Sequence, residues 1–179
     1  MHPQTRLVLT VIGRDRPGLV ERLAALIADH GGNWLESRMS RLGGEFAGIL
    51  RLALPASRAA DLREALVNLS TAGLSAVARE DLETPAAPHR LAELELVGQD
   101  RPGIVRQIAA ALAAHGVNVE ELETECVSAP MSGETLFKEH ARLALPPGTD
   151  LARLRAELER IAADLLVDLR LQPLDATRS

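Results

Sequence analysis

The chain has 179 residues, of which 46% are hydrophobic and 25% charged, a composition typical of folded globular proteins rather than disordered ones. Its formal net charge is −5 and it contains no run of lysine and arginine, so we expect no direct binding of nucleic acid. The single cysteine, Cys126, excludes an internal disulfide, and the chain starts without a long apolar stretch. We therefore expect a cytoplasmic protein that is not attached to a membrane.

A tandem repeat dominates the sequence. The segment GRDRPGLV at residues 13–20 returns as GQDRPGIV at residues 98–105, an offset of 85. Between residues 9–36 and residues 94–121, 14 of 28 positions are identical without a gap. The repeat predicts two modules of like fold with a linker between them and a tail after them. The predicted parts are residues 1–83 (module), 84–89 (linker), 90–174 (module) and 175–179 (tail).

The first copy predicts six elements in chain order. Residues 7–12 are an apolar run that ends at Gly13 and suits a mostly buried strand. Pro17 is acceptable at the first position of a helix, and apolar residues then recur at helical spacing until Gly31, which favours a stop. Two strands, a second helix and a last strand follow, at about residues 33–42, 46–54, 62–69 and 74–80.

The second copy repeats this order, with clean alternation in its first strand around Leu94 and Leu96. After the second strand the offset grows from 85 to 91. Six extra residues, around 128–133, therefore lengthen the hairpin loop before the third strand. The later elements are expected at about residues 104–112, 117–127, 136–145, 151–161 and 165–171.

The order βαββαβ, present twice, defines the expected fold class. Right-handed crossovers place both helices of each copy on one face of a four-stranded antiparallel sheet, the ferredoxin-like α+β arrangement. The other face of the first sheet would show Val8, Thr10, Ile49 and Ala53. Because these residues are largely apolar, we expect the second module or a partner to cover them, and we expect a homo-oligomer such as a dimer.

The loop before the first helix of each copy is a candidate ligand site. In the first copy, Asp15 to Gly18 place backbone N–H groups and the positive end of a helix dipole at the end of a strand, which suits a carboxylate or a phosphate. Asn33 is expected close enough to add its side-chain amide, and an acid such as Asp15 could bind the amino group of an amino acid. The alternative is structural: Asp15 caps the helix, Pro17 starts it, and Gly18 allows it to pack close to the sheet.

The phrase Gly-x-Asp-Arg-Pro-Gly between a strand and a helix, followed by a His-Gly-x-Asn turn, resembles the ACT domain, a ferredoxin-like regulatory module that typically binds amino acids at interfaces between modules. Two such modules, at about residues 5–82 and 90–172, with no catalytic domain attached, are similar to the glycine cleavage system transcriptional repressor family. The resemblance implies regulation rather than catalysis, no cofactor, and an amino acid such as glycine as effector. It also implies that genes of amino-acid metabolism are controlled through a DNA-binding partner protein.

The resemblance assigns ligand contacts to the two loops and to the asparagine that follows each first helix. These residues are Asp15, Arg16, Pro17, Gly18, Asn33, Asp100, Arg101, Pro102, Gly103 and Asn118. The copies differ at Arg14 against Gln99 and at Gly32 against Val117, so two equivalent sites are not assumed.

Other chemistry has weaker support. His115, Cys126 and His140 match no compact zinc motif, so we expect no metal site, and Cys126 lacks an assignable catalytic base. Glu121, Glu123 and Glu125 alternate and therefore share one face of a strand, as a ligand-facing acid cluster or as a solvated surface.

Two alternative functions stay open. The same fold could act as an acylphosphatase, with Arg16 holding a phosphate and Asn33 placing a water molecule. Against it, the loop lacks a glycine-rich cradle and Pro17 removes one N–H group. The third possibility is a purely structural dimerisation module that binds no small molecule.

Overall fold

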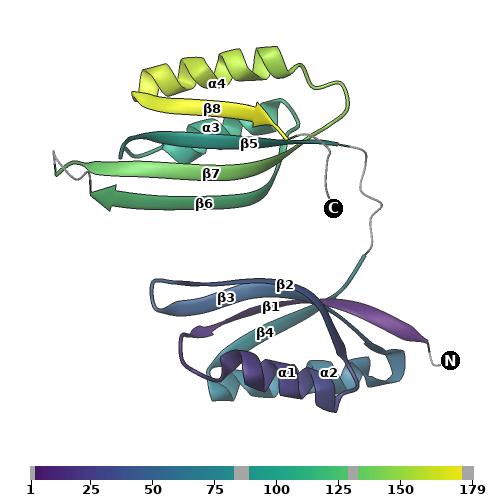
Figure 1. Ribbon diagram of the computed structural model, residues 1–179. Coiled ribbons are helices and arrows are strands. Elements are labelled where there is room, and N and C mark those ends of the chain that lie inside the picture. Colours follow the sequence, from purple (N-terminus) through teal and green to yellow (C-terminus); the bar gives the residue numbers. More distant parts are fainter. Residues whose placement is uncertain (1–2, 83–88, 129–132, 175–179) are drawn as a thin grey trace. The chain divides into compact units, whose positions relative to one another are not determined.

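The computed structural model describes residues 3–82, 89–128 and 133–174, and the chain divides into two compact units, Met1–Thr84 and Pro85–Ser179 (Figure 1). We call them module one and module two. Most of the predicted linker and of the predicted hairpin insertion, and all of the predicted tail, lie outside the described residues. The exact domain boundaries stay a prediction.

Module one has the predicted order of elements, with strand order β2-β3-β1-β4 and antiparallel pairing throughout. Both helices lie on the same face of the sheet (Figure 1). Its elements are β1 (Gln4–Arg14), α1 (Leu19–Asp29), β2 (Asn33–Leu42), β3 (Glu45–Pro55), α2 (Ala59–Leu69) and β4 (Leu74–Glu80), with single 3-10 turns at Ala56–Arg58 and Ser70–Ala72.

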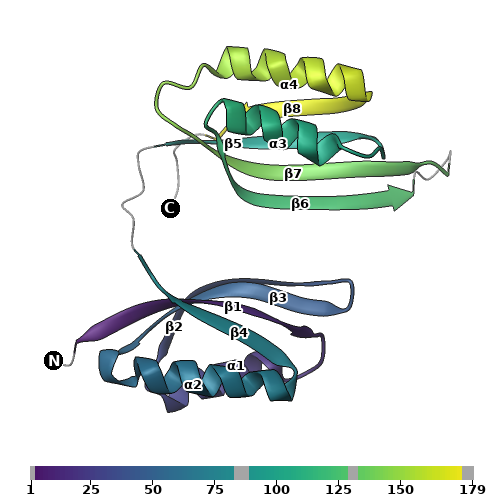
Figure 2. The same cartoon turned by 180° about the vertical axis from the view of Figure 1, so that it is seen from behind.

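Module two repeats the arrangement with strand order β6-β7-β5-β8. Figure 2 shows its two helices over one face of the sheet. The predicted ferredoxin-like fold is therefore confirmed in both copies. Its elements are β5 (Arg90–Gln99), α3 (Ile104–Ala114), β6 (Asn118–Ser128), β7 (Thr135–Leu145), α4 (Leu151–Leu165) and β8 (Val167–Pro173).

Two connections distinguish the modules. Gly43 and Gly44, both with positive φ, join β2 to β3 in a tight two-residue turn. The connection from β6 to β7 is longer, as the change of offset predicts. The predicted start of the last strand at Leu165 is wrong, because α4 continues through Leu165 and the chain turns at Leu166, whose φ is 57°. An apolar residue at position 165 suits the buried face of a helix as well as a strand.

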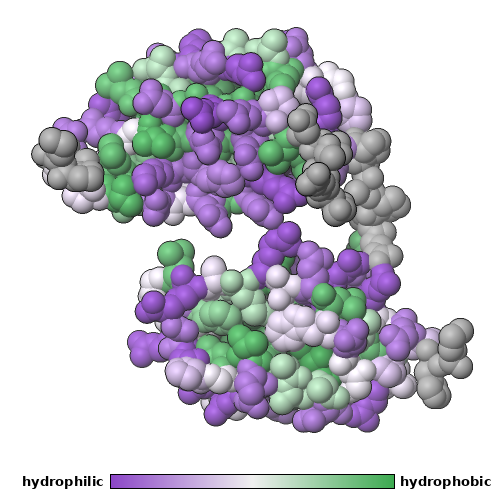
Figure 3. Space-filling model, in the orientation of Figure 1, coloured by the Kyte–Doolittle hydropathy of each residue, from purple (hydrophilic) through white to green (hydrophobic). Residues whose placement is uncertain are grey.

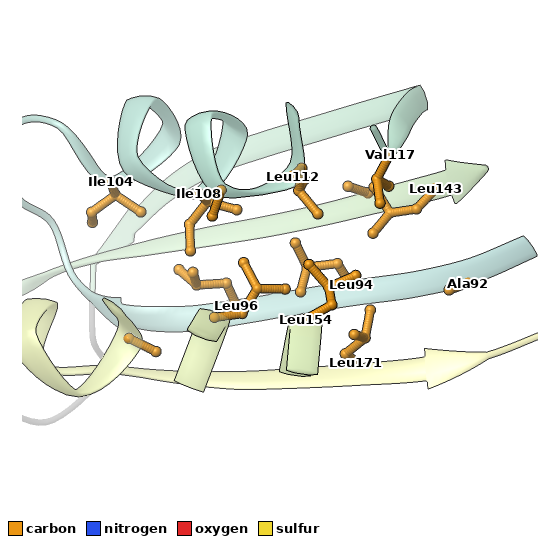
Figure 4. Close-up of a cluster of buried hydrophobic side chains, with 14 of the residues drawn as sticks. Ala92, Leu94, Leu96, Ile104, Ile108, Leu112, Val117, Leu143, Leu154 and Leu171 are labelled. Atoms are coloured by element: carbon orange, nitrogen blue, oxygen red, sulfur yellow. The ribbon is translucent and has the colours of Figure 1, made fainter. Parts of the chain in front are cut away.

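The core of each module is aliphatic and lies between the sheet and its helices. In β1, Leu7, Leu9 and Val11 are almost fully buried, while the residues between them point to the other face of the sheet. Module two repeats this pattern, with Leu94 and Leu96 beneath α3 (Figure 4). Each leucine buried in this way stabilises its module by roughly 1.5 to 3 kcal/mol, so the repeated alternation is what holds each sheet to its helices.

The sheet faces without helices differ in chemistry. On module one, Ile12, Ile49 and Val77 are each about half exposed and form an apolar strip around Thr10. On module two, the positions of Ile49 and Val77 are held by His140 and Arg170. Figure 3 shows hydrophilic residues gathered over β6 and β7. Among the described residues, no helix has the length and apolar character needed to cross a bilayer.

Candidate ligand-binding site

The same backbone hydrogen bond anchors both candidate loops. The N–H group of Asp15 donates to the carbonyl oxygen of Gly44 at 2.9 Å, and that of Asp100 donates to the carbonyl oxygen of Thr135 at 3.0 Å. Thr135 stands where the offset of 91 places the counterpart of Gly44. Each loop is therefore fixed to the hairpin between the second and third strands of its own module.

The helices after these loops begin at glycines with left-handed backbones, Gly18 with φ 90° and Gly103 with φ 94°. A Cβ on Gly18 would meet no atom within 4 Å, so the expectation that Gly18 permits close packing is wrong. Glycine is required there for its positive φ, which a residue with a Cβ adopts only with strain. The helix starts at Leu19, so Pro17 lies two residues before it rather than at its first position.

The N-termini of α1 and α3 have no side-chain cap from any described residue. By contrast, the carboxylate of Asp150 caps α4 by accepting a hydrogen bond from the N–H group of Arg153 at 3.0 Å. The first-turn N–H groups of α1 and α3 are thus left for another acceptor. Together with the helix dipole, they favour binding of an anionic group such as a carboxylate.

Asp15 does not cap α1. Its Oδ2 lies 2.6 Å from Nε of Arg41, on β2, in a partly exposed ion pair. Cys126 occupies the position of Arg41 in module two, so this ion pair has no counterpart there. The carboxylate of Asp100 consequently lacks the charge partner that occupies Asp15.

The arginines and prolines of the loops lie at the surface. Nη2 of Arg101 donates to Oε1 of Gln99 at 3.1 Å, which holds the side chain back along β5. Arg16 extends toward Gly73, where a Cβ would stand 3.3 Å from its Nη2. Pro17 and Pro102 are exposed beside them. All of the predicted loop residues are thus close together within their own module.

Asn33 and Asn118 lie elsewhere. Asn33 pairs with Ala53, which pairs with Arg6, so Asn33 lies level with the start of β1. Asp15 follows the end of that strand, nine residues and about 30 Å away. Asn118 is related to the second loop in the same way, through Ala144. The expectation that each asparagine reaches the loop of its own module is wrong, because α1 and α3 carry the chain back along the sheet.

Asn33 instead borders a shallow depression of about 710 Å³ at the other end of the sheet of module one. Arg6 and Asp81 also line it. The carboxylate of Asp81, whose side chain is only 11% exposed, forms an ion pair with the guanidinium of Arg51. The charge of this acid is therefore already neutralised by a neighbour.

First-turn charges make the two helix N-termini unequal. The third residue of α1 is Glu21, and the corresponding residue of α3 is Arg106. An acid near a helix N-terminus competes with an incoming anion, whereas an arginine attracts it. The first-turn charge therefore favours an anion at the N-terminus of α3 over one at the N-terminus of α1.

The residues considered for zinc are dispersed. Nε2 of His115 lies 2.8 Å from Oε2 of Glu157, and this hydrogen bond is the main reason why the pKa of Glu157 is lowered. His140 lies 3.9 Å from Glu93, on the open face of the sheet, and Cys126 is exposed on β6. Within the described ranges, no group of three or more histidine, cysteine or acidic residues could hold a metal ion.

The three alternating glutamates of β6 do share one face. Each stands opposite a basic residue of β7 on the side of the sheet without helices. Nζ of Lys138, for example, lies 3.3 Å from Oε1 of Glu125 in an exposed pair. This matches the solvated strand surface rather than an acid cluster. The pairs are Glu121 with Arg142, Glu123 with His140 and Glu125 with Lys138.

Sequence reasoning missed Glu139. Its side chain is 5% exposed on the helix-covered face of β7, and its Oε2 has no hydrogen-bond partner in the described part of the chain. Burial raises the pKa of this carboxyl. The signal was present in the sequence, because Glu139 is in phase with Phe137 and Ala141, the buried residues of the same strand.

Comparison with known proteins identifies relatives of similar sequence and fold. The chain is 26% identical over 167 residues to the glycine cleavage system transcriptional repressors of Escherichia coli K12 and of Shigella flexneri, covering 90% of this chain and 86% of each relative. The crystal structure of an unknown protein from Galdieria sulphuraria is 32% identical, covers 96% of this chain and 99% of that one, and superposes with a TM-score of 0.83.

A second crystal structure, assigned provisionally to the glycine cleavage system transcriptional repressors, has a TM-score of 0.68 at 20% identity, covering 96% of this chain and 98% of that one. At that identity it supports the fold alone. Family models described as the ACT domain match residues 5–76 and residues 92–162, which are the two segments that carry the Asp-Arg-Pro-Gly loops. The chain therefore belongs to the ACT domain family and carries two ACT domains in tandem.

Proposed function

We propose that this protein is a non-catalytic regulator that senses an amino acid and controls transcription of genes of amino-acid metabolism. The observation that carries the proposal is the alignment of 90% of the chain with a curated transcriptional repressor, across both ACT domains. The effector is an amino acid such as glycine, and the protein acts in the cytoplasm. Its ligand carboxylate is held at the N–H groups that follow the Asp-Arg-Pro-Gly loops.

The regulator acts through a DNA-binding protein and not by itself. Each helix of the two modules packs on a sheet and contributes to a buried core, so none is free in the way that a recognition helix must be among the described residues. The net charge of −5 also opposes binding to a phosphate backbone. A second copy of the chain associates through the apolar strip of module one.

An acylphosphatase activity is not favoured. That activity needs Arg16 and Asn33 around one phosphate, yet the register places Asn33 level with Arg6, about 30 Å along β1 from the loop that contains Arg16. No turnover of acetyl phosphate is expected from the purified protein. Measurable hydrolysis that grows in proportion to protein concentration would favour the enzyme over the regulator.

Ligand sensing is tested by thermal shift of the full chain against glycine and the other nineteen proteinogenic amino acids. A ligand at about 100 times its dissociation constant adds roughly 2.7 kcal/mol to stability, so a true effector raises the midpoint of unfolding measurably. If no amino acid of the panel changes the unfolding temperature, the result would support the alternative hypothesis of a structural dimerisation module.

The site is tested by Arg106→Glu, which gives α3 the first-turn acid that α1 carries at Glu21. Arg106 is exposed, so the fold should be unaffected, while repulsion of the ligand carboxylate should weaken binding roughly threefold to tenfold. Arg79 is an exposed residue of β4, in module one. Arg79→Glu makes the same change of net charge away from the loop of module two and should leave binding unaltered. Equal affinities of the two variants would place the ligand elsewhere.

A further inference from the structure

Glu139 is a buried acid with no role in the fold so far described. In β7 it pairs with Leu96 on one side and Thr124 on the other, and its side chain shares the face of the sheet that the helices cover. Its side chain is 5% exposed, and among the described residues none forms a hydrogen bond with its Oε2. An ionised carboxyl that is buried in this way is strongly destabilising unless a cation or a hydrogen-bond donor meets it.

Module one has no such acid. The offset of 91 places Gly48 at the position of Glu139. A Cβ on Gly48 would stand 2.4 Å from the carbonyl oxygen of Arg38 and 2.5 Å from Cγ of Met39, so module one has no room there for a side chain. The buried carboxyl is thus specific to module two.

The strand beside Glu139 has changed as well. Thr124 and Cys126 replace Met39 and Arg41 of module one on the helix side of the sheet. Both replacements are smaller, and both are exposed, as is the neighbouring Leu122. The residue of β6 directly paired with Glu139 is therefore the small, exposed Thr124.

The position of Glu139 relates it to the candidate site. Leu96, its partner on β5, lies under α3. Ile104 and Ile108 point from that helix toward the sheet (Figure 4). These two residues belong to the first two turns of α3, whose uncapped N–H groups follow the Asp-Arg-Pro-Gly loop. A carboxylate and a set of carboxylate-binding N–H groups thus lie on the same side of the sheet and along the same stretch of α3.

An α-amino acid carries the complementary pair of charges. Its carboxylate suits the helix N-terminus, and its ammonium group can donate the hydrogen bond that Oε2 of Glu139 lacks among the described residues. Asp100 is less suited to the ammonium group, since its side chain is exposed and water screens an exposed charge. In module one, Asp15 is already paired with Arg41.

We propose that Glu139 binds the ammonium group of the amino-acid effector, so that module two holds the complete site and module one does not. The inference rests on the proposed function and adds to it the residue that recognises the amine and the number of ligands per chain. In module one, the backbone and Met39 leave no room for a side chain at Gly48. In module two, the corresponding position holds the Glu139 carboxyl, with the smaller Thr124 and Cys126 beside it, and forms a ligand site.

The test is isothermal titration calorimetry of the full chain with glycine, with the amino acids that shift its unfolding temperature, and with glycolate, which keeps the carboxylate of glycine but lacks the amine. The parent protein should bind one amino acid per chain. Glu139→Gln should weaken that binding roughly 10- to 100-fold, the loss expected for one charge-assisted hydrogen bond. Glycolate should bind the parent and Glu139→Gln equally and weakly.

Two further variants keep the result interpretable. Thr124→Met restores the residue of module one beside an unchanged Glu139 and should also weaken binding, by filling the approach to the carboxyl. Glu123→Gln removes a charge from the opposite face of β6 and should bind like the parent.

The outcomes separate the two proposals. Parent-like binding by Glu139→Gln, or two equal ligands per chain, would overturn the role of Glu139 while amino-acid sensing stands. If no amino acid of the panel binds the parent, the sensing function fails and the Glu139 site fails with it.

Discussion

The buried carboxyl of Glu139 has a consequence for stability that needs no ligand. Burial raises its pKa in the folded protein, so the folded state holds this proton more tightly than the unfolded state. The favourable contribution is complete below the unfolded pKa and is lost as the pH rises through the folded pKa. Near neutral pH, Glu139→Gln should therefore be more stable than the parent by roughly 1 to 2 kcal/mol, because a neutral amide replaces a buried acid whose Oε2 has no hydrogen-bond partner among the described residues.

Urea unfolding at several pH values checks this prediction. The advantage of Glu139→Gln should shrink as the pH falls from about 7.5 toward about 4.5, where the parent carboxyl becomes protonated in both states. The exposed Glu123→Gln serves as control and should show no such trend. A destabilised Glu139→Gln at neutral pH would mean that the carboxylate has a stabilising partner.

Leu166 is the other residue in an unfavourable state. Leu166 connects α4 to β8 with a φ of 57° and is 65% exposed. The corresponding turn of module one uses Gly73, with φ 81°. Because a left-handed backbone is strained for a residue with a Cβ, Leu166→Gly should stabilise the protein by about 1 kcal/mol, measured as a shift in the urea midpoint.

The reverse change tests the same physics in the other module. Gly73→Ala places a Cβ into a left-handed turn and should lower stability by about 1 kcal/mol. If Leu166→Gly is less stable than the parent, the partly buried portion of the leucine outweighs its backbone strain.

Single residues show where sequence reasoning works. The sequence alone reveals the Asp-Arg-Pro-Gly loops and their repetition, because the residues of each motif are contiguous in the chain. The pairing of Asp15 with Arg41 is not evident in this way, because it joins residues whose proximity depends on the hairpin that brings β2 back to the loop. Glu139 was within reach, since a charged residue in the buried phase of a strand is visible from alternation alone.

At the scale of elements, the six-element order and the two sheets followed from periodicity and from the position of glycine and proline. The wrong prediction concerned the position of Asn33 relative to the loop. The sequence predicts that Asn33 follows α1, and it does, but an eleven-residue helix returns the chain by about 16 Å antiparallel to β1. Asn33 thereby reaches the far end of the sheet instead of the loop.

The open sheet face of module one is predicted to mediate self-association. The apolar strip of module one includes Ile49, which is 49% exposed, and an exposed apolar sheet face favours association with a second copy. Ile49→Asp introduces a charge at the centre of that strip and should yield a monomer of 19.2 kDa, whereas the parent forms a larger species. Light scattering coupled to size-exclusion chromatography measures both masses.

Val97→Asp is the matched control. Val97 is 40% exposed on the open face of module two, next to charged residues, so a further acid there should leave the mass unchanged. A monomeric parent, or a dimer that survives Ile49→Asp, would contradict association through this strip.

At the scale of the whole molecule, the two ACT domains share a fold but have diverged in chemistry. Module one has an apolar open sheet face, a paired Asp15 and a first-turn acid in α1. Module two has a charged open face, an arginine in the first turn of α3 and the buried Glu139. A duplication permits such divergence because each module has its own hydrophobic core.

The net charge of the molecule opposes direct binding to DNA. A chain of net charge −5 releases few counterions from DNA, and its described helices are occupied in packing against the two sheets. The purified protein should therefore form no complex with promoter DNA in a mobility-shift assay at about 150 mM salt, with or without glycine. Its effect should appear only when the DNA-binding partner is added, as an altered mobility of the partner's complex. A complex formed by this protein alone that resists excess non-specific DNA would show that the chain reads DNA directly.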